Sequence, residues 1–518
     1  MSERRKQNPA LPPDPDSVPR RPPQDPNRRR TAAFLSAALC AVAAHGFLFA
    51  NEFFSHDSVS YFNYTEWGFR FYTGIGRFLI PVYEACKGPI AAPWLIGILF
   101  TLWMSLTAVV VTDLLDIQTP SAVALAAGLL CTNVSVSLTG ATYVYCMDEY
   151  AFALLGAAGA AFLFLRGGRL ALFGTLPLLA SLSIYQPYAT VTAVLCLLAL
   201  LRDALDGRRF RTVLFRGVTA LSLLAVSYLF YRCLWTFLRV LCQIPQTRDV
   251  VSFRDFGPLA RLMSANSAFF GFLFRPGVVL GPLRPVAHGC LLVFLFWRLL
   301  RALTDGRIPV QNRMLVLLFS ALLPATLYSV AFIMPGEAHD LTAYARELFY
   351  LLPLSLLDAP GARAPRRTVS PERVTVCVLL SLLLWHHVVY ANQAYMKKDL
   401  EKTSTLLLAA RIIDRMESVP GYVPGETRVA FVGRLDDNEP LDVPFEPFRD
   451  FQQQTGLWHT HAATYNFGRY LTDYLRYPVL WDRESGVTRS ELAKAMPAFP
   501  AEGSVRMIDG VVVVKLSG

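Results

Sequence analysis

The chain has 518 residues, of which 53% are hydrophobic and 17% charged, and its mean hydropathy is +0.37. This composition excludes an ordinary soluble globular protein and indicates a polytopic membrane protein. The net charge of +10 does not indicate a nucleic-acid partner, because the Arg residues cluster in short loops between apolar segments. The nine Cys include no CxxC pair, which is typical of small core residues rather than of metal ligands.

The N-terminal residues 1–31 are rich in Pro, Arg and Asp and contain almost no apolar side chains. We expect them to form a disordered cytoplasmic tail. The tail ends in Arg28, Arg29 and Arg30, directly before the apolar run 33–50. This run has no convincing cleavage site, so it is predicted to be a signal anchor with its N-terminus in the cytoplasm.

Further apolar segments follow along the chain, several of them close to the roughly 17-residue minimum for crossing the hydrocarbon. The apolar block 170–201 is divided at Tyr185-Gln186-Pro187, because Pro breaks a helix. With the signal anchor this gives eleven predicted spans. The ten that follow it are 92–112, 120–140, 149–165, 170–185, 187–201, 212–235, 287–303, 314–334, 344–358 and 374–392.

The Arg residues between these segments predict which loops face the cytoplasm. With the N-terminus inside, the Arg-rich loops around 166–169, 202–211, 298–313 and 363–373 all lie inside. The intervening loops are poorer in Lys and Arg for their length, so alternate loops satisfy the positive-inside rule. We expect them to lie outside the cytoplasmic membrane.

The loop 51–91 is the most unusual of these outer segments. It is too polar for the hydrocarbon, yet it contains many Phe, Tyr and Trp residues around His56, Asp57 and Arg77. This composition is typical of a membrane–water interface. A long loop next to a membrane segment is more often functional than merely connecting, so we expect part of a site here.

Three further outer junctions carry polar side chains. Asp148 and Glu149 precede the helix 149–165, Gln186 lies in the 170–201 break, and Arg346 follows an acidic loop containing Asp340. The cytoplasmic loops offer mainly Arg with scattered Asp. We therefore expect any chemistry to take place at the outer face.

Two outer regions complete the predicted organisation. Apolar residues at helical spacing in 254–274 predict an amphipathic helix on the outer leaflet, within the long outer loop 236–286. After the last span, residues 394–518 combine an amphipathic helix with two strand-like segments, which predicts a small α/β domain outside. The expected fold is therefore mainly α, with about eleven transmembrane helices in 32–393 and this C-terminal domain.

The order of these features resembles the polytopic glucosyltransferase II family, the Gtr-type enzymes that glucosylate O-antigen and related bacterial surface glycans. The resemblance covers roughly residues 35–390. It depends on the acidic first outer loop leading to Gly76-Arg77-Phe78, the Tyr-x-x-x-Met-Asp-Glu-Tyr junction at 143–150, and Ser183-Ile184-Tyr185-Gln186-Pro187-Tyr188. It implies a GT-C type membrane fold and a polyprenyl-phosphate sugar donor, with glucose the expected sugar, used outside the cytoplasmic membrane.

Glycosyl transfer from a lipid phosphate needs a carboxylate that deprotonates the acceptor hydroxyl, and cationic groups that hold the departing phosphate. We assign Asp57 as the general base, with Asp148 or Glu149 as the alternative or as a ligand of the sugar hydroxyls. In the first loop Asp57 is followed by Ser58, where the resemblance leads us to expect a pair of acids, so the division of roles stays open. The groups expected to bind substrate are Arg346 for the phosphate with Arg77 as second choice, and His56, Tyr185, Gln186 and Tyr188 for the sugar.

Each of these residues also has a structural interpretation. The acids can serve as helix-start residues stabilised by the helix dipole, and the Arg side chains can extend to the lipid headgroups. His386 and His387 lie in the last span without a visible acidic partner, and are predicted to be a packed pair. His459 and His461 have metal-compatible spacing but no further ligands, so no metal or other cofactor is expected, while a need for a divalent ion is left open.

Two other functions fit a chain of this kind. A transporter or flippase of lipid-linked sugars predicts ionisable residues near the middle of the bilayer, or inverted repeats with broken helices. A scaffold for envelope assembly predicts no convergence of polar groups. The sequence places its acids at the outer ends of the spans and contains no clear repeat, which favours the glycosyltransferase, with donor lipid, glycan acceptor and membrane lipids as partners.

Overall fold

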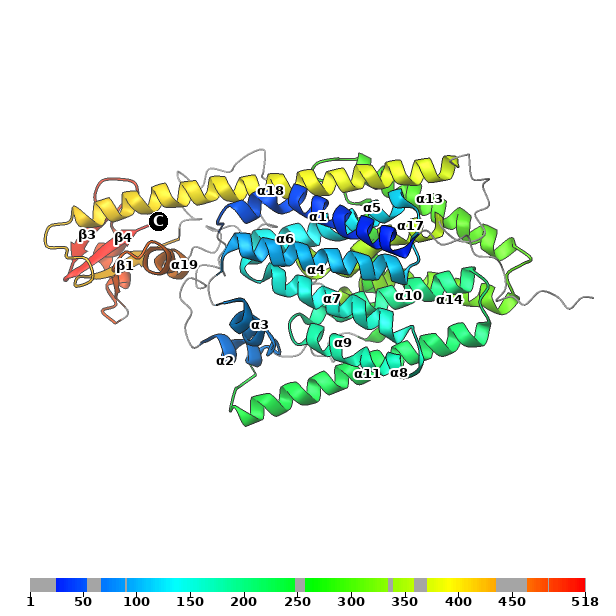
Figure 1. Ribbon diagram of the computed structural model, residues 1–518. Coiled ribbons are helices and arrows are strands. Elements are labelled where there is room, and N and C mark those ends of the chain that lie inside the picture. The colour runs from blue at the N-terminus through cyan, green and yellow to red at the C-terminus, as the bar shows by residue number, and fades with distance from the viewer. Residues whose placement is uncertain are drawn as a thin grey trace, which may run out of the picture.

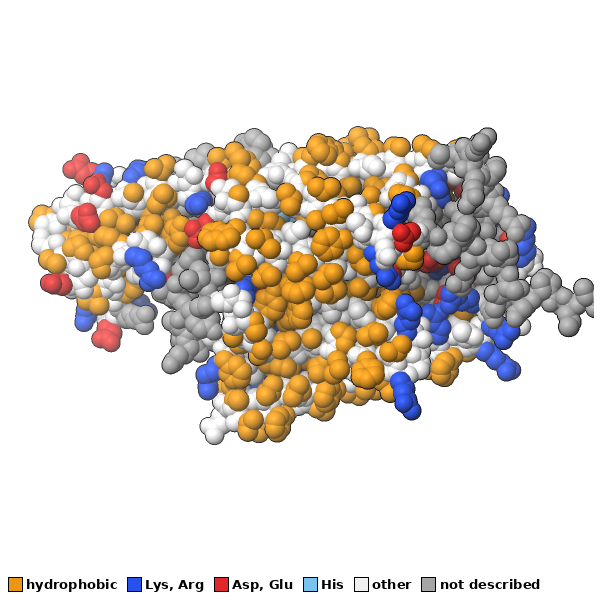
Figure 2. All heavy atoms as spheres, in the orientation of Figure 1, with side chains coloured by type: hydrophobic (Ala, Val, Ile, Leu, Met, Phe, Trp, Pro, Cys, Tyr) orange, Lys and Arg blue, Asp and Glu red, His pale blue; other side chains and the backbone are white. Residues whose placement is uncertain are grey.

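A computed structural model describes residues 25–53, 67–88, 91–246, 257–333, 339–357, 370–434, 464–482 and 484–517. Within these residues the protein is mainly helical, as predicted. A bundle of long helices forms most of the molecule, and a small C-terminal α/β unit lies at one end of it (Figure 1). Orange apolar side chains cover the middle of the bundle in Figure 2, as expected for a surface that faces lipid.

Eight candidate membrane spans occur in the described part of the chain, by length and apolar composition. Three of them are formed by α1 (Pro26–Ala50), α4 (Pro93–Leu114) and the interrupted run of α5 (Pro120–Thr132), α6 (Val134–Tyr143), η3 (Val144–Cys146) and α7 (Met147–Phe164). The others are η4 (Gln186–Tyr188) with α10 (Ala189–Leu205), α11 (Phe210–Leu241), α13 (Leu283–Thr304), α14 (Val310–Leu327) and α18 (Pro371–Glu417).

The predicted count of eleven spans is not confirmed. The expected spans 120–140 and 149–165 belong to one apolar run of 45 residues. The expected span 170–185 is the short pair α8 (Gly168–Phe173) and α9 (Thr175–Leu182), and the expected span 344–358 is divided into α16 (Tyr344–Glu347), η6 (Leu348–Tyr350) and α17 (Leu351–Leu357). Hydropathy identifies apolar segments, but it does not show where a helix breaks inside the protein.

Local sequence explains where the long helices begin. Four of them have a Pro at one of their first two positions: Pro26, Pro93, Pro120 and Pro371. Pro lacks a backbone N–H, but an N–H at these positions would have no hydrogen-bond partner within the helix. Because α1 begins at Pro26, residues 26–31 are helical rather than part of the expected disordered tail. At the buried break between α5 and α6, Asn133 caps the second helix by accepting the N–H of Val136.

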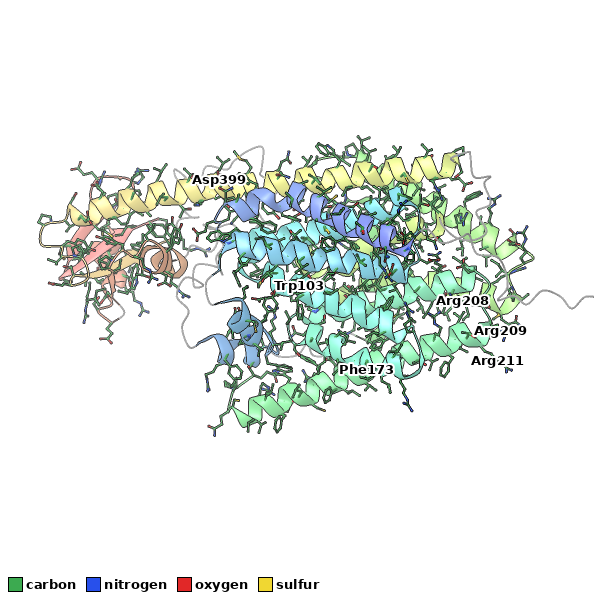
Figure 3. All side chains as sticks on the ribbon, in the orientation of Figure 1. Trp103, Phe173, Arg208, Arg209, Arg211 and Asp399 are labelled. Atoms are coloured by element: carbon green, nitrogen blue, oxygen red, sulfur yellow. The ribbon has the colours of Figure 1, made fainter. Side chains whose placement is uncertain are left out.

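One end of the bundle is rich in Arg. Figure 3 labels Arg208, Arg209 and Arg211 at the end opposite the C-terminal strands, and blue side chains gather there in Figure 2. Ion pairs connect four helices at this end: Arg29 with Asp113, Arg202 with Asp116, and Arg216 with Asp203. The helices joined are α1, α4, α10 and α11, so these charges fix the bundle at that end.

Shorter elements lie toward the other end or between the long helices. The segment 51–91 contains α2 (Trp67–Gly74) and α3 (Ile80–Lys87), and the helix predicted within 254–274 is present as α12 (Pro258–Phe274), while its position on the outer leaflet stays a prediction. Arg261 of α12 is buried rather than on a polar face, and its guanidinium donates to the carbonyl of Phe332 over 3.0 Å. Two further short pieces are α15 (Ser329–Ile333) and η5 (Asp340–Thr342).

The C-terminal unit is a mixed α/β structure, as predicted. Its strands β1 (Arg428–Val432), β2 (Leu480–Trp481), β3 (Val505–Ile508) and β4 (Val511–Lys515) form a sheet in the order β2-β1-β4-β3. Strand β1 is parallel to both neighbours, and β3 is antiparallel to β4. The short helices α19 (Thr464–Arg469) and α20 (Glu491–Lys494) belong to the same unit.

A single helix joins this unit to the bundle. The sequence suggests a span ending near residue 392 and a separate amphipathic helix, but α18 is one continuous helix of 47 residues. At 1.5 Å per residue it is roughly 70 Å long, more than twice the hydrocarbon thickness. Its last turns bury Ile412 and Met416 against Phe431 and Val514 of the sheet.

Candidate active site

The end of the bundle nearer the C-terminal unit contains a buried cluster of opposite charges. Asp148 and Glu149 occupy the first turn of α7, and both are fully buried. The ammonium nitrogen of Lys87, the last residue of α3, lies 3.1 Å from Asp148 Oδ1 and 2.9 Å from Glu149 Oε1. One cation therefore holds two adjacent carboxylates from another helix.

The end of α3 positions this cation. Gly88 follows Lys87 with a φ of 98°, a conformation that favours glycine, and its N–H donates to the carbonyl of Glu84 over 2.8 Å. The Lys87 side chain is 4% exposed and also donates to the carbonyl of Tyr145 over 3.1 Å. The ammonium is thus directed inward with all three N–H groups in use.

Burial and charge both act on the ionisable groups of α3. Burial by itself lowers the pKa of Lys87, but the charges of Glu149 and Asp148 outweigh it and raise the pKa of the ammonium above its ordinary value. Burial raises the pKa of Glu84 to about 7, against a lowering by Lys87 and a further raising by Asp148. A carboxyl group with a pKa near neutrality is an arrangement found at functional sites.

Arg77 contacts a group of stacked Tyr rings next to this cluster. Its guanidinium donates to the hydroxyl of Tyr150 over 2.7 Å and lies 5.1 Å from the ring centre of Tyr185. The rings of Tyr150 and Tyr185 are stacked with centroids 4.2 Å apart, and Tyr188 meets Tyr185 edge-on at 4.9 Å. The cation–π and stacking contacts hold the planar guanidinium in place.

The side chain of Gln186 connects the helix break at Pro187 with the segment that precedes Arg77. Its side-chain N–H groups donate to the carbonyl of Ile75 and to the hydroxyl of Tyr231, each over 3.0 Å. Tyr231 in turn donates to the carbonyl of Gly76 over 3.0 Å. Gly76 has a φ of 83°, and a Cβ there would meet both the Tyr231 hydroxyl and the Gln186 amide. Only glycine permits this close approach, which explains the Gly at the start of Gly76-Arg77-Phe78.

A second buried polar cluster surrounds Arg346 of α16. Its guanidinium contacts Asp340 and the hydroxyl of Tyr328 through Nη1 and Glu347 through Nε, the Glu347 contact measuring 3.1 Å. The same group lies 4.4 Å from the ring centre of Phe272 in α12. Burial acts to raise the pKa of Asp340, but the charge of Arg346 more than offsets it and holds that pKa below its ordinary value.

Aromatic rings connect the two clusters. Tyr188 lies edge-on to Tyr344 with centroids 5.7 Å apart, and Tyr344 is two residues before Arg346. Tyr344 is anchored by donating to the carbonyl of Leu130 over 2.7 Å. Asp148, Arg77 and Arg346 thus belong to one continuous buried region, although no ion pair joins Asp148 or Glu149 to Arg346 among the described residues.

The sequence identified part of this region. Arg77, Asp148, Glu149, Tyr185, Gln186 and Tyr188 are brought together, and Arg346 lies in the adjoining cluster. His56 and Asp57, the latter assigned as general base, lie outside the described residues, as do Glu337, His459 and His461. No group of three or more metal-ligating side chains occurs where the structure describes the chain.

Sequence reasoning missed Lys87 and underrated Glu84. Two adjacent acids at a helix start that is otherwise apolar require a nearby cation if they are buried. Lys87 is the sole Lys of the loop 51–91, which is the signal that could have identified it. Glu84 lies one helical turn before it, so both side chains fall on one face of α3.

Comparison with known proteins agrees with this arrangement. No curated protein and no solved structure matches the chain. The family model described as "Glucosyl transferase GtrII" matches residues 46–357, which include both buried clusters and the helices that carry them. The chain therefore belongs to the GtrII glucosyl transferase family, and it is a glycosyltransferase with several apolar helices of membrane-spanning length.

Proposed function

We propose that this enzyme transfers a hexose, with glucose as the expected sugar, from a polyprenyl-phosphate donor to a surface glycan outside the cytoplasmic membrane. The observation that carries the proposal is the pair of fully buried carboxylates at the start of α7, held by Lys87 and continuous with the Arg77 and Arg346 region. Acids and guanidiniums placed together at the end of an apolar bundle suit a reaction between a lipid phosphate and a hydroxyl group.

The proposed orientation follows from the distribution of Arg. The Arg-rich end of the bundle is opposite the C-terminal strands (Figure 3), and basic residues favour the cytoplasmic side. This supports the proposal of a cytoplasmic N-terminus, with the acid cluster and the C-terminal unit on the outer side. The acceptor glycan would then reach the site from the envelope, while the isoprenoid chain of the donor stays in the bilayer.

The proposed reaction is a glycosyl transfer at the anomeric carbon of the donor sugar. The acceptor oxygen bonds to that carbon, its proton passes to a carboxylate, and the bond from the carbon to the phosphate oxygen breaks, which releases polyprenyl phosphate. We keep Asp57 as the proposed base. Asp148 or Glu149 is the alternative, since Glu149 Oε2 has no hydrogen-bond partner among the described residues. Cationic groups of the site would hold the phosphate as its charge increases.

A transfer assay tests the proposal. Purified enzyme in lipid nanodiscs is incubated with isolated envelope glycan and with polyprenyl-phosphate glucose, galactose or mannose, each carrying a radiolabelled sugar. We expect label to enter the glycan from the glucose donor, and Asp57→Asn to abolish transfer. Glu491→Gln in the C-terminal unit, whose side chain is 89% exposed, is the matched control and should transfer normally.

Two outcomes would contradict the proposal. Transfer at the wild-type rate by Asp57→Asn rules out the assigned base and leaves Asp148→Asn and Glu149→Gln to be compared. In proteoliposomes, movement of labelled donor across the bilayer without a new glycosidic bond would instead indicate a flippase.

A further inference from the structure

Arg284 is a buried guanidinium that makes no ion pair with an acid in the described part of the chain. It lies in the first turn of α13 and is 7% exposed. Its Nη1 donates to the carbonyl of Arg275 over 3.2 Å, and its Nε has no hydrogen-bond partner among the described residues. Arg346, which sequence reasoning chose for the phosphate, already pairs with Asp340 and Glu347. A buried guanidinium with an unmade hydrogen bond and no ion pair is costly and needs an explanation.

Arg284 and Arg346 share one aromatic ring. Their guanidinium carbons lie 4.8 Å and 4.4 Å from the ring centre of Phe272. Arg275 lies 4.0 Å from Asp340, but its side chain is 67% exposed and is therefore solvated. The charge of Arg284 also acts on Glu347, yet no carboxylate of the described residues lies within ion-pair distance of the Arg284 guanidinium.

Helix α18 places two His residues next to Arg284. His386 and His387 are 2% and 1% exposed, and the Nδ1 of each has no hydrogen-bond partner among the described residues. A Cβ on Gly277 would lie 2.8 Å from Arg284 Cδ and 3.0 Å from His386 Cε1, so both side chains pack on this glycine. Unsatisfied polar atoms of Arg284 and His386 thus occur side by side, where α13 packs beside α18 (Figure 1).

The surface of α13 next to Arg284 is apolar and open. Leu283 and Val286 are 61% and 59% exposed, on a helix long and apolar enough to span a membrane. An anion attached to an isoprenoid chain could keep its chain against these side chains while its phosphate reaches Arg284. A free inorganic phosphate would gain nothing from them.

We propose that Arg284 and His386 form the binding site for the singly charged phosphodiester of the lipid donor, with Arg284 rather than Arg346 as its principal cation. Arg284 makes no ion pair among the described residues, and its unused N–H can supply a charge-assisted hydrogen bond to the singly charged phosphodiester. Arg346, held by Asp340 and Glu347, then keeps the Phe272 ring and the loop before it in place. The identity of the lipid rests on the proposed function, whereas the anion site rests on the contacts of Arg284.

Direct binding tests the site without requiring transfer. The dissociation constant of a short-chain polyprenyl phosphoglucose is measured for the purified protein in detergent by thermophoresis. We expect Arg284→Gln to weaken binding at least tenfold and His386→Gln severalfold. Gly277→Ala should also weaken it, because the added methyl group displaces both side chains. Arg301→Gln, at the other end of α13, is the matched control and should bind as wild type.

Competition identifies the source of the phosphate. Farnesyl phosphate should displace the probe, whereas inorganic phosphate and phosphatidylglycerol micelles at the same concentration should not. Equal displacement by either of these overturns the assignment to the donor lipid. Wild-type affinity in Arg284→Gln and Gly277→Ala, both with the elution profile of folded protein, overturns the anion site. If the variants lose probe binding as expected while the wild type transfers no sugar in the glycan assay, that result would count against the proposed function alone.

Discussion

Lys87 Nζ lies 2.9 Å from Glu149 Oε1, with both side chains almost completely removed from solvent. The pair joins α3, in the segment 51–91, to α7 of the bundle, and the same nitrogen also contacts Asp148. A short surface helix is thereby fixed to the membrane part by charge, at the point where the candidate active site is built.

Removing the positive charge of Lys87 should strongly destabilise the folded protein. Lys87→Met leaves two buried carboxylates without a partner, which costs about 3–5 kcal/mol of folding free energy for a buried pair. We expect little folded protein in detergent and no transfer, measured by size-exclusion chromatography and by the glycan assay. Lys494→Met, which breaks an exposed pair with Glu491, should cost less than about 1 kcal/mol. Similar effects of the two substitutions would contradict the role given to Lys87.

The Gly76 position should tolerate no side chain. Gly76→Ala requires a strained backbone and places a methyl group against the Tyr231 hydroxyl and the Gln186 amide. We expect a loss of about 2 kcal/mol or more, seen as a clearly lower thermal unfolding midpoint. Gly68→Ala in α2 is the matched control, because a Cβ there meets no atom within 4 Å. An unchanged midpoint for Gly76→Ala would show that this turn is not held as described.

Glu84 should make stability depend on pH. Its pKa is raised to about 7 in the folded protein, mainly by burial, from an ordinary value of 4.5. The folded state therefore holds the proton more tightly, so this contribution is fully present below pH 4.5 and is lost as the pH rises through 7. Glu84→Gln should unfold at a higher temperature than wild type at pH 8 and differ less at pH 5. The exposed Glu502→Gln should leave the pH dependence unchanged, and a constant difference across pH would refute the assignment.

The orientation can be tested with a native cysteine. Cys86 on α3 is exposed, whereas Arg209 lies at the opposite end of the bundle. In spheroplasts, a membrane-impermeant maleimide should label a variant that keeps only Cys86. The Arg209→Cys variant in a cysteine-free background should react only after the membrane is permeabilised. The reverse pattern would invert the proposed topology.

Membrane character, helical content and most of the polar region were predictable from sequence, because each has a local signal. Apolar runs predict helices wherever the solvent is lipid, and Asp148 and Glu149 stand out in an apolar run. The α/β character of the C-terminal unit was predictable for the same reason, from β-branched runs such as that of β4.

The partners of these residues were not predictable. Lys87 meets Glu149 across 62 positions of sequence, and Tyr231 meets Gly76 across 155. Arg284 was counted as one of several outer-loop Arg residues, since nothing in its neighbourhood distinguishes it. Its lack of an ion pair becomes visible only once α12, α13 and α18 are packed together. The breaks within 120–164 and 344–357 were missed for a similar reason, because buried polar contacts rather than hydropathy decide them.

The continuity of α18 has a mechanical consequence. An uninterrupted helix curves gently but does not hinge. From His386 to the sheet contacts of Met416 it covers about 45 Å at 1.5 Å per residue. A displacement of the C-terminal unit along the axis of α18 would therefore be carried by this rod to the turn of His386, which packs with Arg284 on Gly277. If the proposed anion site is occupied there, the position of the C-terminal unit and the occupancy of that site would be linked.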